Sequence, residues 1–216
     1  MKTTMLFILL LISGSLIWGQ ETAITSSGNI VILNEDGTWK LLKNEIDKSI
    51  SFRKSTWGCS KEIVKAQEDK EIIYEDDDAI IYKGSISNLE CSIIFIFTSE
   101  KLIRGRYYFD ENHSNTNSYI DDYQLIKKLL IEKYGNPKED EQIWKNDLYK
   151  DDYTGWGMAI SLGHMYYYAK WETDQTEIFI QLYGDNYKIK HVIDYTSKAL
   201  GALEDEISNA KAKEEL

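Results

Sequence analysis

Few side chains in this sequence have the type and spacing that catalysis requires. The best candidate nucleophile is Cys59, because Ser60 is a good N-cap and predicts a helix over residues 60–69. A thiol at the N-terminus of a helix can have a lowered pKa and react as a thiolate. A G-x-S-x-G segment, which would expose a serine nucleophile, does not occur. We therefore expect no catalytic residue and a protein that is not an enzyme.

The two cysteines, Cys59 and Cys91, have two interpretations that both stay open at this point. In an oxidising compartment they could form a disulfide, which for a loop of this length would stabilise the fold by about 3–4 kcal/mol. Alternatively, both are separate buried thiols, which is common for a cysteine in an apolar strand. Spacing alone does not fix the geometry that a disulfide needs.

Patterns typical of metal ligands are also missing from the sequence. The separations of His113, His164 and His191 do not resemble a ligand cluster, and neither H-E-x-x-H nor C-x-x-C occurs. Two acidic clusters, residues 75–78 and Asp147 with residues 151–152, lack the spacing of an EF-hand calcium loop. We expect no metal site and no cofactor.

An aromatic segment is the more informative feature for function. On a strand, Tyr166 and Tyr168 share one face and Tyr167 points to the other. One of these faces presents tyrosine outside the core unless a further layer, such as a helix over residues 119–134, covers it. Exposed tyrosine and tryptophan are enriched at binding hot spots. We predict a binding surface that contains Trp156, Tyr166, Tyr168 and Trp171.

Two alternatives to a binding protein come from other features. Asp151 and Asp152 lie near Trp156, and paired carboxylates beside tryptophan suit a hydrolase that acts on sugars. A carrier of a small apolar ligand is the other alternative, with the apolar stripe of a helix at the C-terminus closing its pocket.

The first 19 residues have the pattern of a leader that precedes the folded part of the chain. Residues 1–19 have a basic start, an apolar run over residues 5–12 and small residues before Gly19, which is the layout of a secretory signal peptide. The apolar run is shorter than the roughly 20 residues that span a bilayer. We expect cleavage after Gly19 and export to a bacterial periplasm or beyond. No lipid anchor is expected at the cut, because no cysteine lies near it.

Residues 20–51 are predicted to form an N-terminal hairpin and a linker. Residues 30–33 and 38–42 are apolar or β-branched strand segments, and the turn residues 34–37 between them include Asp36 and Gly37.

The body, residues 52–197, is predicted to be a tandem α-β-β-β duplication. The longest helix covers residues 119–134 and has apolar residues at a 3.6-residue period. Shifting the chain by 85 residues aligns the hairpin at 93–109 with the hairpin at 178–195, and Ile93 with Ile178. Residues 158–162 are predicted to be a further strand. Residues 198–216 are predicted to be a C-terminal helix. The fold class is therefore α+β: an N-terminal β-hairpin, two helix-plus-antiparallel-sheet units in a layered arrangement, and a C-terminal helix.

Two short motifs resemble segments of known proteins. Val31, Leu33, Asp36, Gly37, Thr38 and Trp39 form a V-x-L-x-x-D-G-T-W pattern that resembles a hairpin of small exported bacterial proteins of unknown function. Trp57, Gly58, Ser60 and Val64 form W-G-x-S-x-x-x-V, which resembles the opening of uncharacterised exported bacterial proteins. The helix-then-strands arrangement, used twice, is similar to the tandem repeats of the β-lactamase inhibitory proteins and to the small lipoproteins of outer-membrane assembly. The chain lacks the acylated cysteine of those lipoproteins, and no functional residue carries over from any of these families.

Composition narrows the class of partner. The net charge of −11 becomes −12 once Lys2 leaves with the leader, and an acidic surface repels nucleic acid and anionic membranes. With 43% hydrophobic residues, the chain can form a sizeable core, so disorder is not expected. We predict an exported, non-enzymatic protein that binds another protein or an envelope component, with no transmembrane span after cleavage. The sequence does not indicate the oligomeric state.

Overall fold

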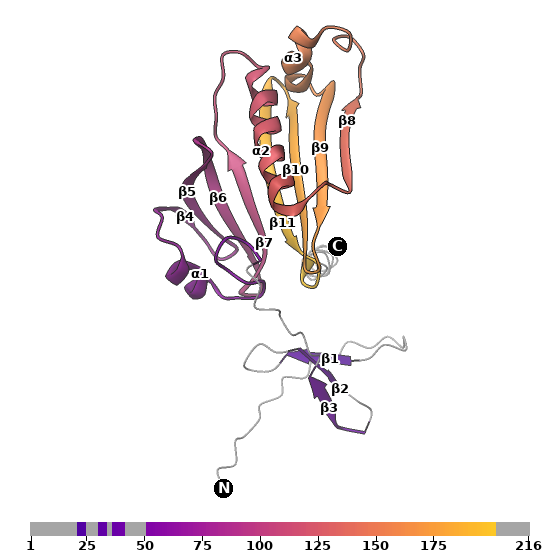
Figure 1. Cartoon of the computed structure of the whole chain (residues 1–216). Helices are drawn as coiled ribbons and strands as arrows, with labels where there is room; N and C mark the ends of the chain where they lie inside the picture. Colours follow the sequence, from indigo (N-terminus) through magenta and orange to yellow (C-terminus); the bar gives the residue numbers. More distant parts are fainter. Residues whose placement is uncertain (1–20, 25–29, 34–35, 42–50, 202–216) are drawn as a thin grey trace, which may run out of the picture. The chain divides into compact units, whose positions relative to one another are not determined.

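The computed structural model describes residues 21–24, 30–33, 36–41 and 51–201 (Figure 1). The chain divides into two compact units, residues 1–47 and residues 48–216. The predicted signal peptide lies outside the described residues, and so does the predicted C-terminal helix beyond residue 201.

The N-terminal unit is a small antiparallel sheet in the order β1-β2-β3. Its strands are β1 (Glu21–Ile24), β2 (Ile30–Leu33) and β3 (Trp39–Leu41). β2 and β3 form the predicted hairpin, while β1 was not predicted. In the turn, one carboxylate oxygen of Asp36 accepts hydrogen bonds from the backbone N–H and the hydroxyl of Thr38, at 2.9 and 2.5 Å. This is how an aspartate stabilises a tight turn.

The second unit is an α+β structure that is mostly sheet. Its elements are α1 (Lys61–Gln67), β4 (Ile72–Glu75), β5 (Ala79–Ile86), β6 (Leu89–Thr98), β7 (Lys101–Phe109), α2 (Ser118–Tyr134), β8 (Glu139–Trp144), the 3-10 turn η1 (Tyr153–Gly155), α3 (Trp156–Ser161), β9 (Met165–Glu172), β10 (Thr176–Asp185) and β11 (Lys188–Ser197). All eight strands belong to one antiparallel sheet, in the order β4-β5-β6-β7-β11-β10-β9-β8.

Each helix-plus-sheet unit has four strands, one more than the predicted α-β-β-β arrangement. A helix is followed by four strands, β4 to β7, and a second helix by four more, β8 to β11, with α3 inserted before β9. The two sets meet through their last strands, so they form one continuous sheet. The predicted strand at residues 158–162 is wrong, because this segment belongs to α3. A short apolar run does not distinguish a buried strand from a buried helix.

Three hairpins of this sheet turn through two residues that both have positive φ. These pairs are Ser87–Asn88, Ser99–Glu100 and Asn186–Tyr187. Positive φ at both positions is the geometry that matches the twist of paired strands. The last of these turns closes the predicted hairpin at 178–195. Matching turn to turn, residue 99 to residue 186, gives an offset of 87 residues in place of the predicted 85.

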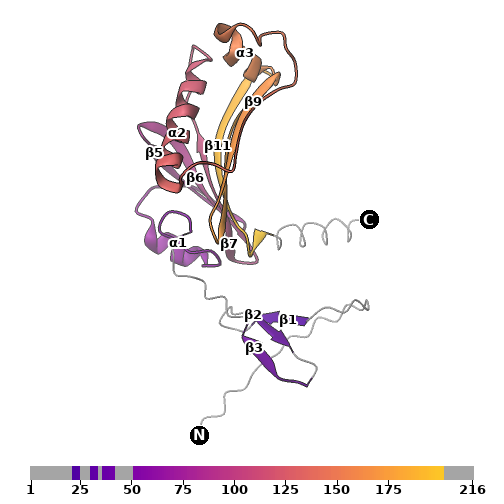
Figure 2. The same ribbon diagram turned by 45° about the vertical axis from the view of Figure 1, so that its right-hand side comes forward.

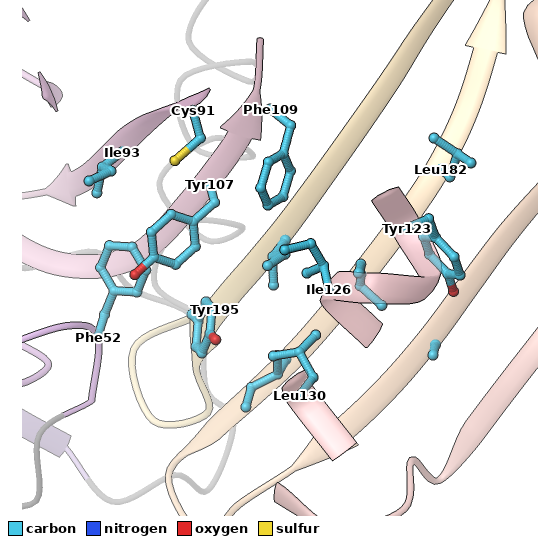
Figure 3. Close-up of a cluster of buried hydrophobic side chains, with 14 of the residues drawn as sticks. Phe52, Cys91, Ile93, Tyr107, Phe109, Tyr123, Ile126, Leu130, Leu182 and Tyr195 are labelled. Carbon is cyan, nitrogen blue, oxygen red and sulfur yellow. The ribbon is translucent and has the colours of Figure 1, made fainter. Parts of the chain in front are cut away.

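The core lies between the sheet and its helices (Figure 3). The strands alternate buried and half-buried residues, so only one sheet face faces this core. Helix α2 covers it with a stripe of buried residues, Ile120, Tyr123, Ile126 and Leu130. The predicted helix at 119–134 is confirmed. It ends at Gly135, which has φ +79° and donates its N–H to the Ile131 carbonyl at 2.8 Å.

Aromatic packing closes the core of the first half, where α1 is short. Phe52, 1% exposed, contacts the rings of Phe95, Tyr107 and Tyr195 at 5.0 to 5.2 Å between centroids. Its ring lies against Gly105, where an added Cβ would be 2.2 Å from the Phe52 ring. Glycine is therefore required at position 105 of β7. Arg53, which follows Phe52 in the sequence, donates to both carboxylate oxygens of the buried Glu68 at 2.7 and 3.0 Å.

The two cysteines are free and buried, so the structure corresponds to the separate-thiol alternative and not to a disulfide. The Cys59 carbonyl accepts a hydrogen bond from the N–H of Leu102, at one end of β7. Cys91 is the register partner of Phe109, at the other end. Seven residues of strand span roughly 20 Å, whereas a disulfide needs Cα atoms within about 7 Å.

We expect the purified protein to contain two reactive thiols when it is unfolded in denaturant without reductant. The separation of Cys59 and Cys91 along β7 prevents them from pairing within one chain. Titration with a thiol reagent, on protein exported to an oxidising compartment and kept monomeric, measures this number. A count of zero would mean that the two cysteines are joined and would contradict the fold described here.

Candidate functional site

The sheet has a second face that no described helix covers. In Figure 2, α1 and α2 lie on the same side of the sheet, and Val64 of α1 and the apolar residues of α3 belong to the same core. We call the opposite side the open face. On β9 and β10 it is formed by the half-buried members of the alternating pattern, which are Tyr166, Tyr168, Lys170, Glu172, Glu177, Phe179, Gln181 and Tyr183.

Aromatic rings gather on the open face of β9 and β10. The rings of Tyr166 and Tyr168 stack with centroids 6.2 Å apart, and Tyr168 lies 5.4 Å from Phe179 on the next strand. Tyr167 pairs with Leu182 in the register, so Tyr183 follows beside Tyr166. We call Tyr166, Tyr168, Phe179 and Tyr183 the aromatic patch. Its residues are half-buried: the rings contact one another and also remain in partial contact with solvent. Tyrosine suits such a surface because it has an apolar ring and a polar hydroxyl.

Next to the patch, the open face is charged and ordered by ion pairs. Arg106 of β7 donates to both carboxylate oxygens of Asp194 of β11, at 2.7 and 3.1 Å. Lys170 lies 3.4 Å from Glu177. Around Phe179 lies a hollow of about 340 Å³, which is also lined by Arg104, Lys170, Glu177, Asp194 and Thr196. The bidentate pair fixes one arginine in position, because the planar guanidinium and the carboxylate match in geometry.

Lysines cluster around Glu172 at the end of β9. Lys138 and Lys198 reach its carboxylate at 2.6 and 3.0 Å, and Lys170 at 3.8 Å. The hydrogen bonds from Lys138 and Lys198 lower the pKa of Glu172 to about 2. Glu172 therefore stays ionised and forms an ion pair with each of these lysines.

A comparison of the chain with family models, with curated proteins and with solved structures finds no match in any of the three. The function must therefore be inferred from the arrangement of the side chains. The resemblances to exported bacterial proteins and to the β-lactamase inhibitory proteins remain predictions.

The structure separates the four predicted binding residues. Tyr166 and Tyr168 lie on the open face. Trp171 does not: it is 2% exposed, it points into the core, and its Nε1–H donates to the Gly135 carbonyl at 2.8 Å. It follows Tyr166 by an odd number of residues on the same strand, so it has to face the other way. Trp156 is in α3, where it packs against Trp144 and Tyr153 at 5.7 and 5.0 Å.

Sequence reasoning missed the part of the patch on β10. Phe179, Gln181 and Tyr183 occupy the half-buried positions of this strand. The alternation in the segment IFIQLY is the signal that could have placed them on one face.

The remaining candidates for chemistry lie apart from one another. Burial raises the pKa of the Cys59 thiol, which disfavours the thiolate that a nucleophile at the start of α1 would need. One carboxylate oxygen of Asp152 accepts from the N–H and hydroxyl of Thr154 at 3.0 and 2.6 Å, and so caps η1. Asp151 is exposed. Within the described part of the chain, no group of three His, Cys, Asp or Glu could hold a metal ion.

The three histidines have separate surroundings. His113 Nε2 lies 2.6 Å from a carboxylate oxygen of Asp122. His164 stacks at 6.3 Å on Tyr149. His191 is 3% exposed in the core and stacks on Phe109 at 4.3 Å. Among the helices of the described ranges, none is long and apolar enough to cross a membrane.

We expect His191 to make the stability of the protein depend on pH. Burial lowers its pKa from 6.5 to about 3, so the folded state keeps the ring neutral where the unfolded chain protonates it. The free energy of unfolding should therefore decrease as the pH falls from 6.5 towards 3, by up to about 1.4 kcal/mol per pH unit from this group. Urea unfolding between about pH 7.5 and 4.5 measures the slope.

His191→Gln should make the free energy of unfolding less dependent on pH than in the unaltered protein. The carboxylates contribute equally to both proteins, so the difference between the two slopes comes from His191. His113→Gln serves as the matched control and should retain the slope. Parallel curves for the unaltered protein and His191→Gln would show that the ring is not held neutral.

Proposed function

We propose that this chain is an exported, non-enzymatic protein that binds another protein through its open face. The observation that carries the proposal is the aromatic patch, which lies on a sheet face that no described helix covers. An apolar side chain on such a face stays in partial contact with water until a partner covers it.

The composition of the patch favours a protein as the partner. Tyrosine gives a large, rigid contact area with few rotatable bonds and a hydroxyl that can form hydrogen bonds, and it is enriched in protein interfaces. Gln181 and the ion pairs around Phe179 add polar groups at the border. Such charged borders contribute orientation and selectivity more than affinity. The net charge of −11 disfavours nucleic acid.

Two further predictions complete the proposal. The leader-like residues 1–19 support export, followed by cleavage after Gly19. The two helix-plus-four-strand halves support an internal duplication, since both end in hairpins with the same positive-φ turn. The alternatives have less support: the candidate acid Asp152 caps a turn, and the hollow around Phe179 is lined by charged side chains, which do not suit an apolar ligand.

Site-specific photocrosslinking in envelope extract tests the proposal. A photoreactive phenylalanine analogue at Tyr168 or Phe179 should give an adduct with one and the same protein. The matched control places the analogue at Tyr187, which is 71% exposed but lies at a hairpin turn. The adduct at Phe179 should decrease strongly in the Tyr166→Ser, Tyr168→Ser variant, because the patch loses two rings.

Two outcomes would count against a binding role. One is the absence of an adduct at both patch positions. The other is the same set of adducts at Tyr187, which would reflect non-specific collision. Circular dichroism and thermal melting of the double variant show whether the fold is retained, which is expected because both tyrosines lie outside the core.

A further inference from the structure

A second hollow lies at the end of the open face where β9 begins and β10 ends. It has a volume of about 280 Å³. Tyr166 of β9 lines it together with Gln181 and Tyr183 of β10, and so does Lys145, which follows β8. The lining of the hollow therefore combines two rings of the aromatic patch with the side-chain amide of Gln181 and the ammonium group of Lys145.

Two glycines line one end of this hollow where backbone segments pack closely. At Gly184 an added Cβ would lie 2.4 Å from the Ile160 carbonyl oxygen, so no larger residue fits there. At Gly163, φ is +74°, and an added Cβ would lie 3.1 Å from the Gly184 carbonyl oxygen. Both positions need glycine for local reasons, so backbone forms this end of the hollow.

The charge of this hollow differs from that of the rest of the open face. Lys145 Nζ lies 5.1 Å from the ring centroid of Tyr166, and Lys190 Nζ lies 5.8 Å from that of Tyr183. Neither ammonium group has an ion pair with any residue in the described ranges, whereas the lysines around Glu172 do. Two lysines that have no ion pair within the described part of the chain thus lie over tyrosine rings, although the net charge is −11. A cation on a ring face can still pair with an anion that approaches from the open side.

We propose that this hollow binds an acidic side chain of the protein partner, a glutamate or an aspartate. This inference rests on the proposed function, because it assigns the chemistry of the group that enters the open face. The carboxylate pairs with the Lys145 ammonium group, and Gln181 has an amide N–H₂ to donate. The methylene part of the side chain packs between the rings of Tyr166 and Tyr183. A charge-assisted hydrogen bond at the edge of an aromatic surface is stronger than a neutral one.

Titration of ¹⁵N-labelled protein with a small probe tests this inference without the partner. The probe is N-acetyl-glutamate amide, and its neutral isostere is N-acetyl-glutamine amide. We expect saturable shifts of the Gly163, Gly184 and Gln181 signals, with a Kd on the order of 10 mM for so few atoms. The isostere should bind at least roughly threefold more weakly. Lys145→Gln should abolish this preference. Lys188→Gln removes an exposed lysine that does not line the hollow and should retain it.

Other results of the titration would overturn the inference. These are no saturable shift at the hollow, equal shifts with both probes, or the same preference in Lys145→Gln. A stronger response to glucuronate than to the glutamate probe would assign the hollow to an acidic sugar. Failure here is distinguishable from failure of the proposed function, because crosslinking at Tyr168 and Phe179 does not depend on Lys145. Unchanged shifts outside the hollow in each variant confirm that the fold is intact.

Discussion

The pairing of β7 with β11 is the constraint on which the rest of this structure depends. Six residue pairs join the two strands, from His191 with Phe109 to Thr196 with Arg104. Without them, the eight strands would form two separate four-stranded meanders, the first following α1 and the second including α2 and α3. The seam is fixed on both sides: on the open face by the bidentate pair of Arg106 with Asp194, and in the core by the stacked rings of Phe109 and His191. One continuous sheet allows α2 to contact β10 and β11 and to enclose a single core.

The same pairing determines what the open face can present. Side chains alternate along each strand, so a shift of one residue at the seam would exchange the two faces of half the sheet. In the observed register, Tyr167 enters the core beside Tyr123, and Tyr166 and Tyr168 point out. Aromatic residues beyond the needs of the core therefore gather on the uncovered side. That side has an aromatic end, where Lys145 and Lys190 have no ion pair with any described residue, and an end around Glu172 where lysines and acids are paired.

Local sequence patterns predicted the elements that depend on local chemistry. The periodic stripe of α2, the N-terminal hairpin and the strands on either side of residues 99–100 were all predicted. The choice between a disulfide and two separate thiols, which the sequence left open, depends on the length of β7 between Cys59 and Cys91. The prediction that Trp171 shares a binding face with Tyr166 and Tyr168 failed, because the alternation along β9 places Trp171 on the opposite face, where it donates to Gly135 at the end of α2. Alternation shows that Tyr166 and Tyr168 share a face, but only the placement of the helices decides that this face is the uncovered one.

Solvent paramagnetic relaxation on tyrosine ring protons tests this central claim most directly. With a neutral gadolinium chelate in solution, the signals of Tyr166 and Tyr168 should broaden strongly. The signals of Tyr167 and Tyr123, which are 7% and 0% exposed, should change little. If Tyr167 broadens as strongly as its neighbours, or if Tyr166 and Tyr168 are protected in the isolated chain, this face is not open and the account is contradicted.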